Sequence, residues 1–210
     1  YNKNMPNLNL LKNACKLLGK YINKNDAVVF ESTVYPGVTE NFCGKILQKI
    51  SKIPFNKKTN NSFFIGYSPE RINPGDKDHK IKDIVKIVAC SSPKGLKKIS
   101  NVYSKIIDAG LHVIKDIKIA ETAKVIENVQ RDVNIALINE ISLVCNKLKI
   151  NIYDVLDAAS TKWNFLNFYP GLVGGHCVGV DPYYLIKESK NQGVYPKLMI
   201  SAREINNSMV

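Results

Sequence analysis

The sequence lacks the features that mark several large classes of protein. It has no Cys-x-x-Cys pair, and its 5 cysteines stand at irregular spacings, which argues against a disulfide framework and against a zinc site. Its first residues form no charged-then-apolar signal pattern, and no apolar run approaches the roughly 20 residues of a membrane span. We therefore expect a cytoplasmic protein with reduced thiols, no bound metal and no membrane partner.

Acidic residues are scarce relative to basic ones. The chain has 18 Asp and Glu against 30 Lys and Arg, a formal net charge of +12, which would suit a nucleic-acid surface. The lysines are scattered among asparagines and isoleucines, however, with no tight basic block and no interleaved aromatic stripe, so we expect no nucleic-acid partner. A basic balance also suits an anionic small substrate such as a nucleotide diphosphate.

The first half of the chain alternates between short apolar runs and helical patterns. Residues 27–30, 63–67 and 84–90 are the apolar runs expected of strands buried on both faces, and residues 112–114 form a shorter one. Helical spacing covers residues 7–23, 39–52 and 93–109. This order predicts an α/β layer with a parallel sheet.

The second half begins with an uninterrupted helical pattern. From Asp116 to Lys149 there is no Gly, no Pro and no turn cluster, which predicts one helix about 50 Å long. Such a helix suits a connector or the core of a dimer. One apolar stripe of this helix consists of Ile126, Val129, Val133, Leu137, Ile141, Val144 and Leu148. A second apolar stripe, which includes Ile135 and Ile138, indicates burial on more than one side. Further helices are predicted near 151–159, 182–190 and 195–208. We place a domain boundary near residue 115, between an α/β part (1–115) and an all-helical part (116–210).

A cysteine stands in a glycine-lined loop that leads into one of these helices. Gly174 and Gly175 precede Cys177 closely, and glycines let backbone approach a ligand because no Cβ blocks the way. A cysteine held in this way can face a substrate, whereas most free cysteines are small buried hydrophobes. A plain turn before a helix, with Asp181 as N-cap and Pro182 at the first position, explains the same residues. The local pattern leaves both interpretations open.

Polar residues interrupt the long helix at helical spacing. Lys124 and Asn128 share one face a turn apart, and Arg131 extends the same polar stripe. A charge and an amide N–H that project together suit a developing oxyanion, and Lys124 near Cys177 would favour the reactive thiolate. The alternative is the solvated face of an amphipathic helix.

Two further candidates follow predicted strands. Thr33 and Glu70 come just after two of them, and ligands of open parallel sheets bind at the carboxyl ends of the strands. Each is also explained by ordinary turn chemistry. His79 and His112 have no partner at metal-ligand spacing and receive no role.

Taken together, these motifs resemble the UDP-glucose/GDP-mannose dehydrogenase family over essentially the whole chain. The matching segments, in order, are residues 31–40 (Ser-Thr-x-x-Pro-Gly), 68–71 (Ser-Pro-Glu), 123–128 (Ala-Lys-x-x-x-Asn), 174–181 (Gly-Gly-His-Cys, then Asp) and 203–206 (Arg-Glu-Ile-Asn). The resemblance implies oxidation of the C6 primary alcohol of a nucleotide sugar to a carboxylate, with two NAD per sugar and no metal.

The resemblance also implies roles for individual residues. Cys177 attacks the C6 aldehyde left by a first hydride transfer, and a second transfer gives a thioester that water hydrolyses. Lys124 and Asn128 stabilise the oxyanions, Asp181 assists the proton and water steps, and Thr33 positions a water. The resemblance assigns Thr33 and Glu70 to cofactor binding. It assigns the following residues to substrate binding: Arg131, Phe168, Tyr169, Gly174 and Gly175.

The substrate branch follows from the residues around the cysteine. Residues 174–185 resemble the branch that acts on UDP-N-acetylhexosamines, because Gly179 and Val180 stand where UDP-glucose enzymes usually carry Pro and Lys. Pro74 also stands where the UDP-glucose branch tends to have a second glutamate. We expect a UDP-N-acetylhexosamine 6-dehydrogenase of surface-polysaccharide synthesis, with a UDP-glucose 6-dehydrogenase as the alternative.

No three of the 12 glycines form the Gly-x-Gly-x-x-Gly motif with which this family begins. The resemblance also implies a C-terminal α/β domain that holds the uridine diphosphate, and the sequence stops at Val210 before it. We therefore expect a fragment, inactive alone, that comprises the second half of a Rossmann-like NAD-binding domain and a central helical domain that forms a homodimer. One rival is a 6-phosphogluconate-type or β-hydroxyacid dehydrogenase, which places Lys and Asn similarly but needs no catalytic cysteine. The other is a helical dimerisation module without activity.

Overall fold

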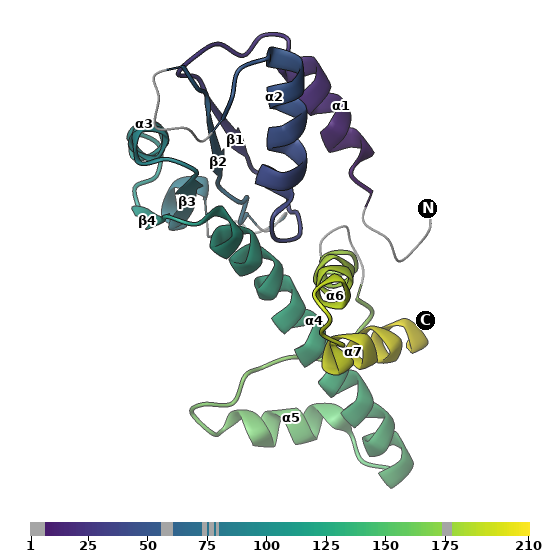
Figure 1. Cartoon of the computed structure of the whole chain (residues 1–210). Helices are drawn as coiled ribbons and strands as arrows, with labels where there is room; N and C mark the ends of the chain where they lie inside the picture. The colour runs from purple at the N-terminus through teal and green to yellow at the C-terminus, as the bar shows by residue number, and fades with distance from the viewer. Residues whose placement is uncertain (1–6, 56–60, 73–74, 76–77, 79, 174–177) are drawn as a thin grey trace. The chain divides into compact units, whose positions relative to one another are not determined.

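The computed structural model describes residues 7–55, 61–72, 75, 78, 80–173 and 178–210. The chain divides into two compact units, and the division falls inside the long helix α4 (Ile117–Leu148; Figure 1). We call residues 6–125 the sheet unit and residues 126–210 the helical unit.

Within its described residues, the sheet unit contains four strands that lie side by side in chain order. They are β1 (Ala27–Phe30), β2 (Phe64–Tyr67), β3 (Lys86–Cys90) and β4 (Leu111–Ile114). The pairs β1–β2 and β3–β4 are parallel, but β3 runs antiparallel to β2. A parallel neighbour needs a long crossover, whereas the only helix described between β2 and β3 is a short 3-10 turn, η2 (Ile81–Asp83). The predicted α/β fold is therefore confirmed, with one antiparallel pair in place of an all-parallel sheet.

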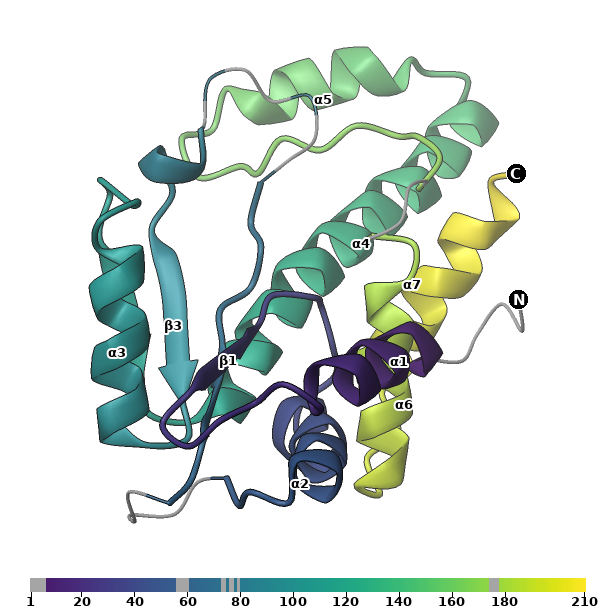
Figure 2. The same ribbon diagram turned by 90° about the horizontal axis from the view of Figure 1, so that it is seen from above.

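Side chains alternate between the two faces of the sheet and create a core on each. Ile65 and Tyr67 join one core with helices α1 (Asn9–Leu18), η1 (Thr39–Gly44) and α2 (Lys45–Ser51), whereas Phe64 joins the other with α3 (Pro93–Tyr103). The view from above shows α3 on one side of the strands and α1 and α2 on the other (Figure 2). The continuous apolar runs of the sequence are thus explained by burial on both faces.

Helix α3 begins as the sequence predicts. The Ser92 hydroxyl accepts a hydrogen bond from the Gly95 amide at 3.1 Å, and Pro93 occupies the first helical position. A Cβ on Gly95 would lie 2.6 Å from Cys90 Sγ and 2.6 Å from Phe64 Cβ, so only glycine lets the helix approach the sheet this closely. The helix ends at Tyr103 rather than near residue 109, and turns lead from there to β4.

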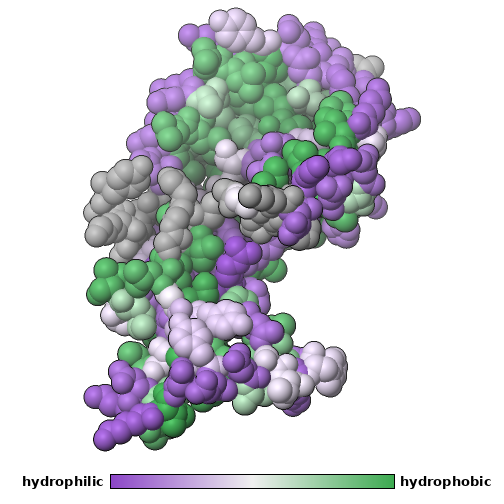
Figure 3. Space-filling model, turned by 180° about the vertical axis from the view of Figure 1, so that it is seen from behind, coloured by the Kyte–Doolittle hydropathy of each residue, from purple (hydrophilic) through white to green (hydrophobic). Residues whose placement is uncertain are grey.

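The sheet unit exposes apolar surface beside β1. Among the described strands, β1 is paired on one side only, and a groove of about 520 Å³ lies next to it, lined by residues that include Leu18, Tyr21, Val28 and Val102. Figure 3 shows a broad apolar area on this unit.

The helical unit consists of the rest of α4 with α5 (Ile152–Ser160), α6 (Asp181–Asn191) and α7 (Lys197–Ser208). The predicted long helix is confirmed to within a residue at each end. Asp181 is the first residue of α6 rather than its N-cap, because its carboxylate is engaged by a side chain of α4 and Val180 stands at the cap. In the described parts of the chain, no helix has the length and apolarity needed to cross a membrane.

Helix α4 buries polar residues beside apolar ones such as Ile138, and it exposes much of the predicted apolar stripe. In the helical unit its buried positions include Asn128, Asp132 and Asn139. The apolar residues of the predicted stripe point largely outward, with Leu137 52% exposed and Leu148 63% exposed. We call Ile126, Val129, Val133, Leu137, Ile141, Val144 and Leu148 the α4 stripe.

Candidate functional site

In the sheet unit, the loops that carry Thr33 and Glu70 run side by side at one edge of the sheet. The Ser68 amide donates to Phe30 O at 2.9 Å and the Glu70 amide donates to Glu31 O at 3.3 Å, which continues the β1–β2 pairing beyond both strands. Thr33 is half-buried beside this pairing. The carboxyl ends of two parallel strands thus present both candidate residues at the same edge.

The Glu70 carboxylate is turned toward its own loop. Its Oε1 atom accepts hydrogen bonds from the amides of Arg71 at 2.7 Å and Ile72 at 2.8 Å. Its Oε2 atom lies 3.9 Å from Lys86 Nζ, and 44% of the side chain remains exposed. Glu70 is therefore fixed in direction while its carboxylate still meets solvent.

Lys86 supplies a buried positive charge at this edge. Its side chain is 5% exposed, and its Nζ lies 3.2 Å from Glu31 Oε1, which also accepts a hydrogen bond from the Tyr103 hydroxyl. Burial, and then the bond to Glu31, raise the pKa of Tyr103. Sequence reasoning missed Lys86 because it assumed a parallel β3. The antiparallel β3 brings its first residue to the carboxyl end of β2.

Glu121, at the start of α4, fixes the loop that follows Thr33. The Glu121 carboxylate is fully buried and accepts hydrogen bonds from the amides of Gly37 at 2.5 Å and Thr39 at 2.9 Å. Gly37 has φ +93, a conformation in which a side chain would be strained. Burial raises the pKa of Glu121, and the bonds from Thr39 and Gly37 offset this only in part.

In the helical unit, two predicted site residues from distant segments meet. Asn128 Nδ2 donates a hydrogen bond to Asp181 Oδ2 at 2.5 Å, and both side chains are buried. Asp181 also lies in the first turn of α6, where the positive end of the helix dipole favours a carboxylate. The pair therefore holds an amide donor and a carboxylate in one fixed arrangement.

The remaining predicted residues are distributed more widely. Lys124 is half-buried on the part of α4 that belongs to the sheet unit, and Arg131 is exposed. Phe168 is half-buried, and Tyr169 is exposed and stacks on Tyr153 with ring centres 6.5 Å apart. The predicted residues Gly174, Gly175 and Cys177 lie outside the described residues.

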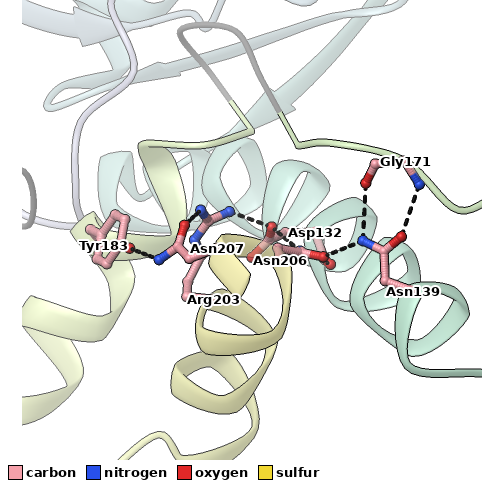
Figure 4. Close-up of polar contacts among 7 residues, drawn as sticks. All are labelled: Asp132, Asn139, Gly171, Tyr183, Arg203, Asn206 and Asn207. Atoms are coloured by element: carbon pink, nitrogen blue, oxygen red, sulfur yellow. Dashed lines mark hydrogen bonds and ion pairs between the residues drawn. The ribbon is translucent and has the colours of Figure 1, made fainter. Parts of the chain in front are cut away.

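A buried polar network joins α4 to α7 and to the segment before the cysteine (Figure 4). Asp132 Oδ1 accepts from Arg203 Nη1 at 2.7 Å and from Asn206 Nδ2 at 2.7 Å. Asn139 Nδ2 donates to Asn206 Oδ1 at 2.9 Å, and Asn139 also binds the backbone of Gly171. Sequence reasoning matched residues 203–206 to the family but gave them no role. The signal it missed is the spacing of Asn128, Asp132 and Asn139 on one helix face.

Within the described residues, no group of three or more His, Cys, Asp and Glu side chains could hold a metal ion. The four described cysteines, Cys15, Cys43, Cys90 and Cys145, are free and buried.

Comparisons with known proteins agree with this arrangement. Residues 1–107 match the NAD binding domain of the UDP-glucose/GDP-mannose dehydrogenase family, and residues 118–208 match the central domain of the same family. The chain belongs to the UDP-glucose/GDP-mannose dehydrogenase family, and NAD is the cofactor that its first domain implies.

Individual relatives are similar over nearly the whole chain. UDP-N-acetyl-D-glucosamine 6-dehydrogenase of Pseudomonas aeruginosa is 50% identical over 97% of the chain and 47% of the relative. Protein CapL of Staphylococcus aureus is 50% identical over 98% of the chain and 48% of the relative. The solved structure of UDP-D-ManNAc dehydrogenase from Pyrococcus horikoshii superposes with a TM-score of 0.88 at 29% identity, covering 98% of this chain and 47% of that one. The chain thus spans about half the length of these relatives.

The described residues fit part of an NAD site. The carboxyl edge of β1 and β2 offers Glu70, whose amide is paired with Glu31, together with the nearby Thr33 and the buried Lys86. The sequence contains no Gly-x-Gly-x-x-Gly loop for the pyrophosphate. Within this chain, the fit therefore extends to this edge of the sheet and not to a pyrophosphate loop.

Proposed function

We propose that the full-length protein containing this chain is an NAD-dependent 6-dehydrogenase of a UDP-N-acetylhexosamine, acting in the cytoplasm in surface-polysaccharide synthesis. The observation that carries the proposal is the buried hydrogen bond from Asn128 to Asp181, which unites two segments 53 residues apart. Both segments hold residues to which the family resemblance assigns chemistry. The burial of both side chains supports these assignments over a solvated helix face and a plain helix start.

The proposed reaction converts one alcohol and one water into one carboxylate, two hydrides and three protons, and bound NAD would supply the acceptor for each hydride. The first hydride transfer leaves an aldehyde at C6, and the Cys177 sulfur adds to its carbonyl carbon to form a thiohemiacetal. Loss of the second hydride gives a thioester on Cys177. Water adds to the thioester carbon, the C–S bond breaks, and the carboxylate leaves while the thiol is restored.

The described residues support the steps around this adduct. An amide nitrogen carries two N–H groups, so Asn128 can hold Asp181 with one and donate the other to an oxyanion. Asp181, fixed by Asn128, accepts a proton from the water that hydrolyses the thioester. We assign Lys124 to the same oxyanions by charge, and Thr33 to the water and cofactor side.

For the substrate, we infer a UDP-N-acetylhexosamine bound with the help of Arg131, Phe168, Tyr169, Gly174 and Gly175. The residues around Cys177 support an N-acetylhexosamine over glucose. Two relatives that are 50% identical are named UDP-N-acetyl-D-glucosamine 6-dehydrogenases, so this sugar is the first to test. The net charge of +12 favours a diphosphate ligand.

The test offers the full-length protein NAD with UDP-N-acetylglucosamine, UDP-N-acetylgalactosamine, UDP-N-acetylmannosamine or UDP-glucose, and measures NADH by its absorbance. We expect NADH from at least one N-acetylhexosamine at a kcat/KM at least tenfold above that for UDP-glucose. A higher kcat/KM for UDP-glucose would show that the protein is a UDP-glucose 6-dehydrogenase instead. No NADH from any of the four sugars would refute the dehydrogenase.

We also infer that the helical part, with its boundary near residue 115, forms a homodimer through the α4 stripe. Four of its apolar side chains, at positions 126, 137, 144 and 148, are 49% to 63% exposed, and a contiguous apolar surface of this kind is typical of an interface. In the proposed dimer, the α4 stripe of one copy of the chain packs against the α4 stripe of a second copy. This observation also favours the second candidate function, a dimerisation module without activity, which the NADH assay separates from the first.

A further inference from the structure

Lys86 is a buried cation at the carboxyl edge of β1 and β2 that takes part in no step of the proposed reaction. Its side chain is 5% exposed, whereas the side chains of its two acidic neighbours, Glu31 and Glu70, are each 44% exposed. A ligand at this edge can therefore reach the two carboxylates but not the ammonium group. Any effect of Lys86 on such a ligand passes through Glu31 or Glu70.

The register of the sheet sets Lys86 opposite Glu70. Tyr67, the last residue of β2, pairs with Ala89 in the antiparallel β2–β3 ladder. The same register, continued three residues beyond β2, places position 70 across from position 86. Lys86 Nζ lies 3.9 Å from Glu70 Oε2, which is too long for a hydrogen bond, so the two groups interact by charge.

The two oxygens of the Glu70 carboxylate have different surroundings. Oε1 accepts hydrogen bonds from the amides of Arg71 and Ile72, which tie it to its own loop. Oε2 is the oxygen that lies within 4 Å of Lys86 Nζ. The positive charge of Lys86 attracts Oε2 and opposes its rotation away from the sheet edge. A ligand that donates to Oε2 then finds the acceptor already oriented, which lowers the cost of binding.

Glu31 and Tyr103 fix the position of the ammonium group itself. Lys86 Nζ lies 3.2 Å from Glu31 Oε1 and 5.3 Å from the centre of the Tyr103 ring. The Tyr103 hydroxyl donates to the same oxygen of Glu31. Burial, and then the bond to Glu31, raise the pKa of Tyr103, so the phenol keeps its proton and remains a donor. Groups on α3 and on the loop after β1 thus hold one buried charge beside Glu70.

We propose that Lys86 is a positioning residue for Glu70, and that it acts by charge rather than by packing or hydrogen bonding. This inference rests on the proposed function, because the family resemblance assigns Glu70 to NAD binding. With a neutral side chain at position 86, Glu70 keeps the hydrogen bonds to its own loop. It loses the attraction that orients Oε2, so NAD binds more weakly.

Calorimetric titration of the full-length protein with NAD, without any sugar, tests the proposal. Lys86→Met and Lys86→Gln both remove the charge, but only glutamine keeps an N–H donor. Lys86→Arg keeps both the charge and a donor. Lys82→Met is the matched control, because it removes a lysine whose ion pair with Asp108 is exposed.

We expect the Kd for NAD to rise about tenfold in Lys86→Met and in Lys86→Gln, because neither side chain carries the charge. Lys86→Arg should stay within about threefold of the wild type, and Lys82→Met within about twofold. If Lys86→Met fails to fold, Lys86→Gln gives the answer, since its polar side chain still suits the neighbourhood of Glu31. A wild-type Kd in Lys86→Gln would overturn the proposal.

A double-mutant cycle with Glu70→Gln tests whether Lys86 acts through Glu70. We expect Glu70→Gln to weaken NAD binding, and the double variant Glu70→Gln/Lys86→Gln to bind NAD within about twofold of Glu70→Gln alone. A Kd that rose by the product of the two single effects would overturn the proposal, because Lys86 would then act independently of Glu70. A role confined to stability would produce no coupling of this kind.

Turnover separates this inference from the proposed function. In Lys86→Gln the KM for NAD should rise while the KM for the sugar changes less than about twofold. A wild type that bound NAD but formed no NADH from any of the four sugars would refute the proposed function. The binding cycle would still establish or overturn the role of Lys86.

Discussion

Replacement of Glu121 by glutamine tests how the loop after Thr33 is held. The Glu121 side chain is fully buried and accepts two backbone hydrogen bonds, from Gly37 and Thr39. Glutamine keeps the shape of the side chain but offers only one acceptor, so one of the two amides would face an NH₂ group. A buried amide without an acceptor costs about 1–3 kcal/mol, which is the loss of unfolding free energy that we expect for Glu121→Gln.

The pH dependence of this loss has a definite sign. Burial raises the pKa of Glu121 above its ordinary value of 4.5, so the native state binds this proton more tightly than the unfolded chain does. The wild type therefore loses stability as the pH rises from 4.5 through the native pKa of Glu121. The glutamine variant has no proton to lose at this position. The stability difference between the two proteins should narrow across that interval.

The assay is urea unfolding of both proteins between about pH 4.5 and pH 8, with hydrogen exchange of the peptide that contains Gly37 and Thr39 as the local readout. Glu140→Gln, at an exposed position of the same helix, is the control and should leave stability unchanged. A difference that widened with pH would refute the reasoning, because it would mean that the two hydrogen bonds to the carboxylate outweigh its burial.

Three further predictions concern the other polar and apolar features. Asn128→Asp replaces the donor with a like charge beside Asp181, and we expect kcat for NADH formation to fall about a hundredfold; a change below about threefold would remove Asn128 from the mechanism. Lys86→Met should lower the unfolding free energy by about 1–3 kcal/mol, because the ion pair of the buried Lys86 with Glu31 is lost. Lys82→Met should leave the unfolding free energy nearly unchanged, because the ion pair of Lys82 with Asp108 is exposed. Leu137→Glu should dissociate the dimer in sedimentation velocity, while Asn146→Glu, on the opposite side of α4, should not; a monomeric wild type would refute the dimer.

The elements of the fold could be predicted because their signals are local. The four strands are short apolar runs, and α4 is a stretch without Gly, Pro or a turn cluster. The antiparallel pairing of β2 with β3 could not be predicted in this way, since direction depends on the connection and not on the strand residues. Lys86 reaches the carboxyl edge of the sheet only because of that pairing, so it was missed for the same reason.

The buried face of α4 shows a second limit of sequence reasoning. Apolar periodicity is used to find the side of a helix that packs, yet in the helical unit Asn128, Asp132 and Asn139 are buried while Leu137 is half-exposed. The polar residues are satisfied by partners on α6 and α7 and by Gly171. Because those partners lie 32 to 74 residues away along the chain, the inward direction of the polar residues cannot be seen in the helix alone.

The most direct test of the central claim is to look for the covalent adduct on Cys177 during turnover. The full-length protein would be mixed with UDP-N-acetylglucosamine and NAD, and the reaction would be quenched in acid. Mass spectrometry would then give the mass of the peptide that contains Cys177, and absorbance would give the amount of NADH formed per sugar. The account predicts an acyl-sugar mass on that peptide, two NADH per sugar, and loss of the adduct and of the second NADH in Cys177→Ala. Two NADH per sugar at an unchanged rate from Cys177→Ala would contradict it.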